Sequence, residues 1–329
     1  VLAQPSKTYI TGHSMGGHIT AAAIDAEAFA TARHKFSYDG AVPMCGVLGD
    51  TELFDYFAGA QVAAQALTGQ AQYPFTQWAD ISAGVQTALF SSFPSATTPN
   101  ATIVPTNPTG LAYASIIQNL TGGPRPMFTP GFTSGGSFSA VWGVFGGDGT
   151  VNGILNKSVI DTNRLTYTVD GQPELSAQIN ATAQKLTAAE DANRLRTDGL
   201  RWIPKANGEF RIPVVSLHTL GDMYVPFSMQ QIFARRVADK GNSQWLVQRA
   251  IRGISHCDFT VAEQARAFDD MIKWANGGPK PAGDDVLTPA TVADSNYGCT
   301  FTNNTVSVDD SASTRALRAG AVAYAPCTQ

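Results

Sequence analysis

The sequence predicts an α/β fold with a parallel sheet, because strand-like and helix-like segments alternate near both ends of the chain. In the first flank a strand is expected at 7–12, a helix at 19–30 and a second strand at 38–48. This order is typical of parallel strands joined by a crossover helix. The alternation is lost after residue 50 and returns after residue 206, so the 329 residues are expected to form one sheet interrupted by an insertion.

The second flank contains four more expected elements, at 211–217, 228–240, 244–251 and 260–276. The first and third are apolar strands, and the second and fourth are helices. Thr260 and Glu263 stand in the register of a capping box at the start of the last helix, and Gly277 is suited to end it. Residues 1–50 and 206–279 are therefore expected to form the α/β core.

Two regions lie outside this core. Residues 51–205 are expected to be mostly helical, with helices at 52–67, 111–120 and 174–195 between stretches rich in Pro, Gly, Ser and Thr. Residues 280–329 begin with Gly-Pro-Lys-Pro-Ala-Gly and are polar and rich in turn-forming residues. This composition predicts a small, peripheral C-terminal extension.

Composition narrows the classes of function. The formal net charge is −4 and Lys and Arg do not cluster, so nucleic acid is not an expected partner. With 43% apolar and 15% charged residues the chain is expected to be globular, and its apolar runs are too short to cross a bilayer. No His or Cys spacing resembles a zinc site, so no metal or other cofactor is expected. A small organic substrate fits these properties better.

The segment Gly12-His13-Ser14-Met15-Gly16 matches G-x-S-x-G, with a strand expected before it and a helix after it. A serine hydroxyl becomes a good nucleophile only when a tight turn holds it exposed beside a base, and small neighbours permit such a turn. The start of the helix supplies N–H groups where negative charge would develop, and the N–H of Met15 is the natural oxyanion donor. The alternative is a glycine-rich turn that binds a phosphate.

A nucleophilic serine needs a histidine base and an orienting carboxylate, and in this topology they follow in the order Ser, acid, His. His256 lies on the loop between the last expected strand and the last helix. Asp222 follows an apolar strand, at the edge where sites form in parallel sheets. Asp50 is a rival acid, although it is expected to cap the helix that follows. The other histidines are His13, His18, His34 and His218.

These motifs resemble the α/β-hydrolase superfamily, in its esterase, lipase and prolyl-oligopeptidase-like branch. The resemblance rests on Gly12 to Gly17, on the run Gly-Asp-x-x-Val-Pro at 221–226 and on His256, and it covers about 5–50 and 207–277. It implies that Ser14 attacks a carbonyl carbon, that His256 relays the proton and that Asp222 orients the imidazole. It also implies that the insertion caps the site.

The same resemblance implies that the sheet is incomplete. Members of the superfamily have several strands before the nucleophile strand, and a loop among them usually supplies the second oxyanion N–H. Only the C-terminal half of an α/β-hydrolase sheet is expected in this chain. An N-terminal segment or a partner chain is therefore expected to complete it.

The function expected is hydrolysis of a carboxylic ester of a small to medium, apolar or aromatic substrate. A prolyl-oligopeptidase-like peptidase or amidase and a non-catalytic binding protein with this fold remain alternatives. Aromatic residues of the insertion can line an acyl or aryl pocket or form the core of the cap itself. They include Phe54, Tyr56, Phe57, Trp78, Trp142 and Phe145.

The four cysteines allow two disulfides. Cys299 and Cys327 bracket the polar tail and can pair, and Cys45 can either pair with Cys257 or remain a buried thiol. Cys257 directly follows His256, which resembles feruloyl esterases and tannases, where a disulfide ties the His loop to the nucleophile. His13 rather than a cysteine precedes Ser14, so that assignment is not expected here. A secreted or periplasmic location is expected.

Overall fold

The computed structural model describes residues 5–70, 75–105, 107–150, 155 and 157–327. Within these residues the main sheet has the strand order β1-β2-β5-β6, and all its neighbours are parallel. The strands are β1 (Tyr9–His13), β2 (Gly40–Met44), β5 (Val214–Thr219) and β6 (Leu246–Ile251). The prediction of an α/β fold with a parallel sheet is confirmed.

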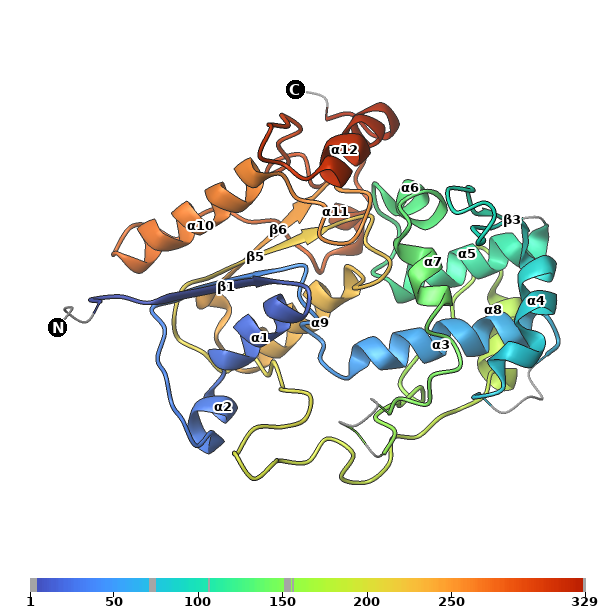
Figure 1. Cartoon of the computed structure of the whole chain (residues 1–329), viewed down its shortest axis with the longest axis horizontal. Helices are drawn as coiled ribbons and strands as arrows, with labels where there is room; N and C mark the ends of the chain where they lie inside the picture. The colour runs from blue at the N-terminus through green and yellow to red at the C-terminus, as the bar shows by residue number, and fades with distance from the viewer. Residues whose placement is uncertain (1–4, 71–74, 106, 151–154, 156, 328–329) are drawn as a thin grey trace.

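Helices cover both faces of this sheet (Figure 1). The face against α10 buries Val42, Val215 and Met271 in one cluster, and the opposite face buries Ala41, Val214 and Phe233 in another. The helices are α1 (Met15–Ala23), α2 (Ala26–Thr31), α9 (Ser228–Asp239) and α10 (Val261–Ala275), with the 3-10 turn η1 (Ser243–Trp245) before β6. Strands β2, β5 and β6 are wholly buried, as a sheet covered on both faces requires.

The expected helix at 19–30 is divided into α1 and α2. Asp25 stands between them, and its buried carboxylate accepts hydrogen bonds from the N–H groups of Glu27 (3.2 Å) and Glu209 (3.2 Å). The first bond caps α2, and the second joins the turn to the segment before β5. A contact with a residue distant in the sequence therefore fixes the break.

The insertion forms a mostly helical body beside the carboxyl edge of the sheet (Figure 1). Its helices are α3 (Glu52–Leu67), α4 (Trp78–Leu89), α5 (Pro108–Leu120), α6 (Phe128–Thr133), α7 (Ser137–Trp142) and α8 (Pro173–Thr182), and a short hairpin pairs β3 (Phe90–Ser92) with β4 (Val104–Pro105). The helix expected at 174–195 ends at Thr182. Beyond it, Leu186 and Ala189 donate backbone hydrogen bonds to Thr162 and Ser158 instead of continuing the helix.

The C-terminal extension lies against the sheet and is less peripheral than expected. The amide of Asp284 donates to the carbonyl of Gln248 on β6 (2.7 Å), and its carboxylate accepts from the amide of Ala250 (2.8 Å). The extension thus covers the edge of β6 that faces away from β5. It contains α11 (Pro289–Val292), α12 (Ala312–Tyr324) and the disulfide Cys299–Cys327. Among the described residues, no helix is both long and apolar enough to cross a membrane.

Candidate active site

Ser14 occupies the turn between β1 and α1. The strand ends at His13 and the helix begins at Met15, so Ser14 stands between them with φ 56° and ψ −119°. A non-glycine residue with positive φ is strained and persists only where its surroundings hold it. Here the amide of Ser14 donates to the carbonyl of Met44 on β2 (3.0 Å). The turn therefore holds the serine hydroxyl at the carboxyl edge of the sheet.

Close packing explains two of the three glycines around this turn. A Cβ atom on Gly12 would lie 2.5 Å from the carbonyl of Gly16, and one on Gly17 would lie 2.5 Å from the carbonyl oxygen of Met44. Around Gly16, outside its own helix backbone and chain neighbours, no described atom lies within 4 Å of such a Cβ. The backbone therefore requires glycine at 12 and 17, whereas position 16 borders open space.

Three strand-end loops bring Ser14, Asp222 and His256 together. The Oγ of Ser14 lies 2.8 Å from Nε2 of His256, and Nδ1 of His256 lies 2.6 Å from Oδ2 of Asp222. When Nδ1–H donates a hydrogen bond to the carboxylate, Nε2 carries the lone pair and faces the serine hydroxyl. The contacts run from serine through histidine to carboxylate, which is the order that a serine nucleophile requires.

The carboxylate of Asp222 is fully buried, and nearby backbone N–H groups donate hydrogen bonds to it. Its Oδ1 accepts from the amides of Tyr224 (2.9 Å) and Val225 (3.0 Å), so Oδ2 is directed to His256. These bonds compensate for the water that a buried carboxylate loses. These contacts of the acid loop fix the orientation of the carboxylate toward the imidazole.

The insertion anchors this acid loop from outside. Arg125 donates from Nε to the carbonyl of Leu220 (2.8 Å), and the Ser137 hydroxyl accepts from the amide of Met223 (3.0 Å). The hydroxyl of buried Tyr56 donates to the carbonyl of Met223 (2.8 Å). The sequence placed Tyr56 only among possible pocket residues and did not single out the other two anchors, because nothing local in the chain links them to position 222.

The pKa of His256 is raised above its usual value of 6.5. Burial alone lowers it, but the charge of Asp222 and its hydrogen bond outweigh burial. His218, behind the acid, behaves oppositely: burial lowers its pKa, and its Nε2 lies 2.7 Å from the carbonyl of Val225. Its Nε2 is 3.9 Å from Asp222, so His218 supports the loop while His256 pairs with the carboxylate.

The remaining candidates are engaged elsewhere. Asp50 pairs with Arg236 (2.7 Å), and the capping position of α3 is taken by Thr51, whose side chain makes no capping hydrogen bond, so the capping role expected for Asp50 is not found. Its Oδ1 instead accepts from the adjacent amide of Thr51 (2.6 Å). His13 lies 2.9 Å from the side-chain oxygen of Gln264, and His18 lies 2.6 Å from the carbonyl of Pro204.

A disulfide joins Cys45 to Cys257. Cys45 follows β2, the strand beside β1, and its sulfur lies 3.4 Å from the amide of Ser14. The bridge therefore ties the His loop to the elbow through the neighbouring strand, although no cysteine stands at position 13. The sequence left the pairing of Cys45 with Cys257 open, and the structure forms it. The partner of Cys257 lies across the sheet and not next to the serine in sequence.

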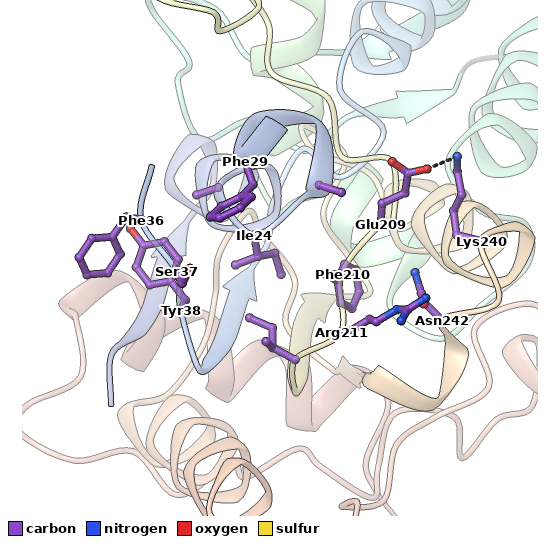
Figure 2. A pocket seen from close by; sticks show the side chains of 13 residues that line it. Ile24, Phe29, Phe36, Ser37, Tyr38, Glu209, Phe210, Arg211, Lys240 and Asn242 are labelled. Atoms are coloured by element: carbon purple, nitrogen blue, oxygen red, sulfur yellow. Dashed lines mark hydrogen bonds and ion pairs between the residues drawn. The ribbon is translucent and has the colours of Figure 1, made fainter. Parts of the chain in front are cut away.

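A cavity of about 600 Å³ lies at the other end of the strands (Figure 2). It is lined by residues that precede β2 and β5, such as Tyr38 and Ile212, and by Phe29 of α2. Figure 2 also shows the ion pair between Glu209 and Lys240 at its rim. Since Ser14 lies at the carboxyl edge of the sheet, this cavity does not belong to the same site.

The parallel sheet, the strand-serine-helix turn and the acid and His loops together resemble an α/β hydrolase, the superfamily that the sequence motifs indicate. No protein-family model matches the chain. A curated relative, the o-phthalyl amidase of Xanthobacter agilis, is 28% identical over 91 residues, which is 28% of this chain and 20% of the amidase.

Solved structures match a larger part of this chain, but with low similarity. Feruloyl esterase B from Aspergillus oryzae matches with a TM-score of 0.35 at 16% identity, over 87% of this chain and 63% of the esterase. Tannin acyl hydrolase from Aspergillus niger matches with a TM-score of 0.38 at 11% identity, over 85% of this chain and 58% of the hydrolase. The chain spans less than two thirds of these proteins.

Proposed function

We propose that the protein is a serine hydrolase that cleaves a carboxylic ester through an acyl-enzyme. Ser14 is the nucleophile, His256 the general base and acid, and Asp222 the orienting carboxylate. The observation that carries this proposal is the continuous relay from Oγ of Ser14 through both ring nitrogens of His256 to the buried carboxylate. Each contact has the length of a good hydrogen bond.

The relay has a direct chemical use. Oγ of Ser14 attacks the ester carbonyl carbon while its proton passes to Nε2 of His256, and the carbonyl oxygen becomes an oxyanion. The N–H of Met15, at the start of α1, stabilises that oxyanion together with the positive end of the helix dipole. The carbon–oxygen bond to the alcohol then breaks, and His256 returns the proton to the leaving alkoxide. Water repeats the cycle on the acyl-enzyme and releases the acid.

Aromatic side chains beside His256 favour an apolar or aromatic substrate. The ring of Tyr224 lies 5.7 Å from the ring of His256 and 5.4 Å from the ring of Phe57 on α3, which in turn lies 6.4 Å from Phe54. Phe54, Phe57 and Tyr224 are half-buried. They form an aromatic wall that leads from the reacting centre to the insertion.

Other aromatic residues considered from the sequence have a different place. Trp78, Trp142 and Phe145 are buried and pack on one another with ring centroids 5.0 to 5.1 Å apart. They belong to the core of the insertion. The substrate contact therefore belongs to the half-buried wall and not to these rings.

An amidase of the same mechanism is a second candidate, because the curated relative that matches part of the chain is an amidase. A pair of substrates with one acyl group, p-nitrophenyl benzoate and benzoyl p-nitroanilide, separates the two. We expect faster hydrolysis of the ester and labelling of Ser14 by a fluorophosphonate. Hydrolysis of the anilide alone would favour the amidase, and a protein neither active nor labelled would be a binding protein of this fold.

We also propose that further polypeptide, an N-terminal segment or a partner chain, pairs with β1. Within the described residues β1 pairs with β2 alone, and it is only partly buried. Beside it, Met15 and Ile19 on α1 are 69% and 53% exposed. Exposed strand edges with apolar neighbours are usually covered in native proteins.

The two disulfides suit an oxidising compartment, so we propose that the protein lies outside the cell or in the periplasm.

The disulfide between Cys45 and Cys257 is expected to support catalysis. The double variant Cys45→Ser/Cys257→Ser removes this bridge and frees the residue next to His256. We expect kcat to fall roughly 10- to 100-fold, because a small displacement of a catalytic group lowers the rate strongly. Replacing Cys299 and Cys327 in the same way removes the more distant bridge and should lower kcat less. Ester kinetics on folded protein measure both. Equal kcat values would show that other contacts suffice to position His256.

A further inference from the structure

Arg318 on α12 reaches the His256 loop from the C-terminal extension. It is 1% exposed although it is charged, and it follows His256 by more than sixty residues of sequence. Its Nη2 donates to the carbonyl of Asp258 (2.5 Å) and to Oε2 of Glu263 (2.7 Å), and its Nη1 donates to Oε1 of Glu263 (2.9 Å). This guanidinium is therefore part of a buried, hydrogen-bonded charge cluster and not of a surface ion pair.

Asp258 closes the loop that carries His256. Its Oδ2 accepts from the amide of Ile254 (3.1 Å), and its carbonyl oxygen would lie 2.6 Å from a Cβ on Gly253. The two ends of the segment 253–258 therefore meet. His256 stands at the tip between them, next to Cys257, whose φ of 54° is in the strained left-handed region.

Glu263 extends the connection to α10. Its Oε2 accepts from the amide of Thr260 (2.8 Å) in the capping box, and its Oε1 accepts from the amide of Asn303 (2.8 Å) in the extension. Arg318 thus binds both the end of the His loop and the start of the helix that follows. One side chain joins the loop, α10 and the extension.

The charges in this cluster depend on one another. Burial raises the pKa of Asp258 and the pKa of Glu263, and in both cases the charge of Arg318 acts in the opposite direction. Nε of Arg318 is 3.8 Å from Oδ1 of Asp258. Without Arg318, two buried carboxyl groups would lose the cation that they share.

Two other contacts hold the tip of the loop from the side of the sheet. These are the disulfide to Cys45 and the hydrogen bond from Thr219 to the carbonyl of Ser255 (2.8 Å). We propose that Arg318 is a positioning residue that fixes the His256 loop from the side of the extension, so that Nε2 stays within reach of Ser14. This inference rests on the proposed function.

The test compares Arg318→Met with Arg315→Met, a control on the exposed face of the same helix. The readouts are the rate constant for fluorophosphonate labelling of Ser14 and the kcat and KM of ester hydrolysis, each on protein shown to be folded by circular dichroism. We expect Arg318→Met to lower the labelling rate and kcat about tenfold with KM unchanged, because His256 is misplaced but the substrate wall is not. Arg315→Met should match the wild type.

Arg318→Lys keeps the charge but cannot bind Asp258 and Glu263 together as a guanidinium does, so it should restore part of the lost rate. It also decides the matter if Arg318→Met does not fold. Wild-type rates in a folded Arg318 variant would overturn the positioning role, even if its melting temperature fell. A wild-type protein that is neither labelled nor active would instead overturn the proposed function.

Discussion

Ser14→Ala is expected to lower kcat for ester hydrolysis by about 10⁵- to 10⁶-fold, as removal of the nucleophile does in serine hydrolases. In the proposed mechanism the hydroxyl oxygen forms the acyl-enzyme, and His256 cannot replace it because its Nε2 serves as the base. A methyl group leaves the turn unchanged, since the backbone of Ser14 is held by Met44. KM should change little, because the oxyanion N–H and the aromatic wall remain.

The control for this variant is Ser37→Ala, which alters an exposed serine before β2, at the far end of the sheet. It should keep the wild-type kcat and the wild-type labelling. Mass spectrometry of the labelled protein checks the assignment independently, since the fluorophosphonate adduct should lie on the peptide that contains Ser14. An adduct on another serine, or a Ser14→Ala protein with wild-type turnover, would contradict the assignment of the nucleophile.

The core of the fold is predictable from local patterns. Each strand of the main sheet carries apolar residues near its expected range, and α10 begins at its expected cap because Thr260 and Glu263 form both bonds of the capping box. The relative position of the site residues follows from topology as well. Parallel strands place their carboxyl ends along one edge, so loops after β1, β5 and β6 meet there.

The features that could not be predicted depend on partners far away in the sequence. Asp25 breaks a helix because Glu209 bonds to it, and Cys45 finds Cys257 across 212 residues. The extension is polar in sequence, yet its Arg318 is buried against Glu263. Local propensity carries no information about such contacts, because each depends on how the folded sheet brings distant loops together.

The candidate site combines both kinds of information. Its three candidate side chains, which the structure brings together, could be chosen from the elbow motif and the order along the chain, whereas their anchors could not. The acid loop is held by Arg125 and Ser137 of the insertion, and the His loop is bound by Arg318 of the extension. The regions outside the α/β core therefore bind two of the three loops that carry the candidate residues.

Asp222→Asn is expected to lower kcat about 10⁴-fold, because it reverses the hydrogen bond that selects the tautomer of His256. An amide oxygen at this position would still accept from Tyr224 and Val225, so the amide nitrogen would face Nδ1 of His256. Nδ1 would then have to accept, and the ring proton would move to Nε2. A protonated Nε2 cannot take the proton of Ser14, so the base is lost while the geometry is kept.

The same variant should shift the pH dependence in a defined direction. Only neutral His256 can act as a base. The value of kcat/KM therefore decreases as the pH drops below the pKa of His256 in the free enzyme. In the wild type Asp222 raises this pKa above 6.5, which places the acidic limb above that pH. Removing the charge of Asp222 leaves burial to lower the pKa, so the limb of the residual activity should move to lower pH.

Asp50→Asn is the matched control, because Asp50 is the other carboxylate that the sequence offered as the acid. It pairs with Arg236 and not with His256, so its loss should lower the melting temperature but leave kcat and the acidic limb unchanged. Profiles of kcat/KM between about pH 5 and 9 measure all three proteins across the range in which His256 titrates. An unshifted limb in Asp222→Asn, or a shifted limb in Asp50→Asn, would contradict the assignment, because the carboxylate that raises the pKa of the base must be the one that orients it.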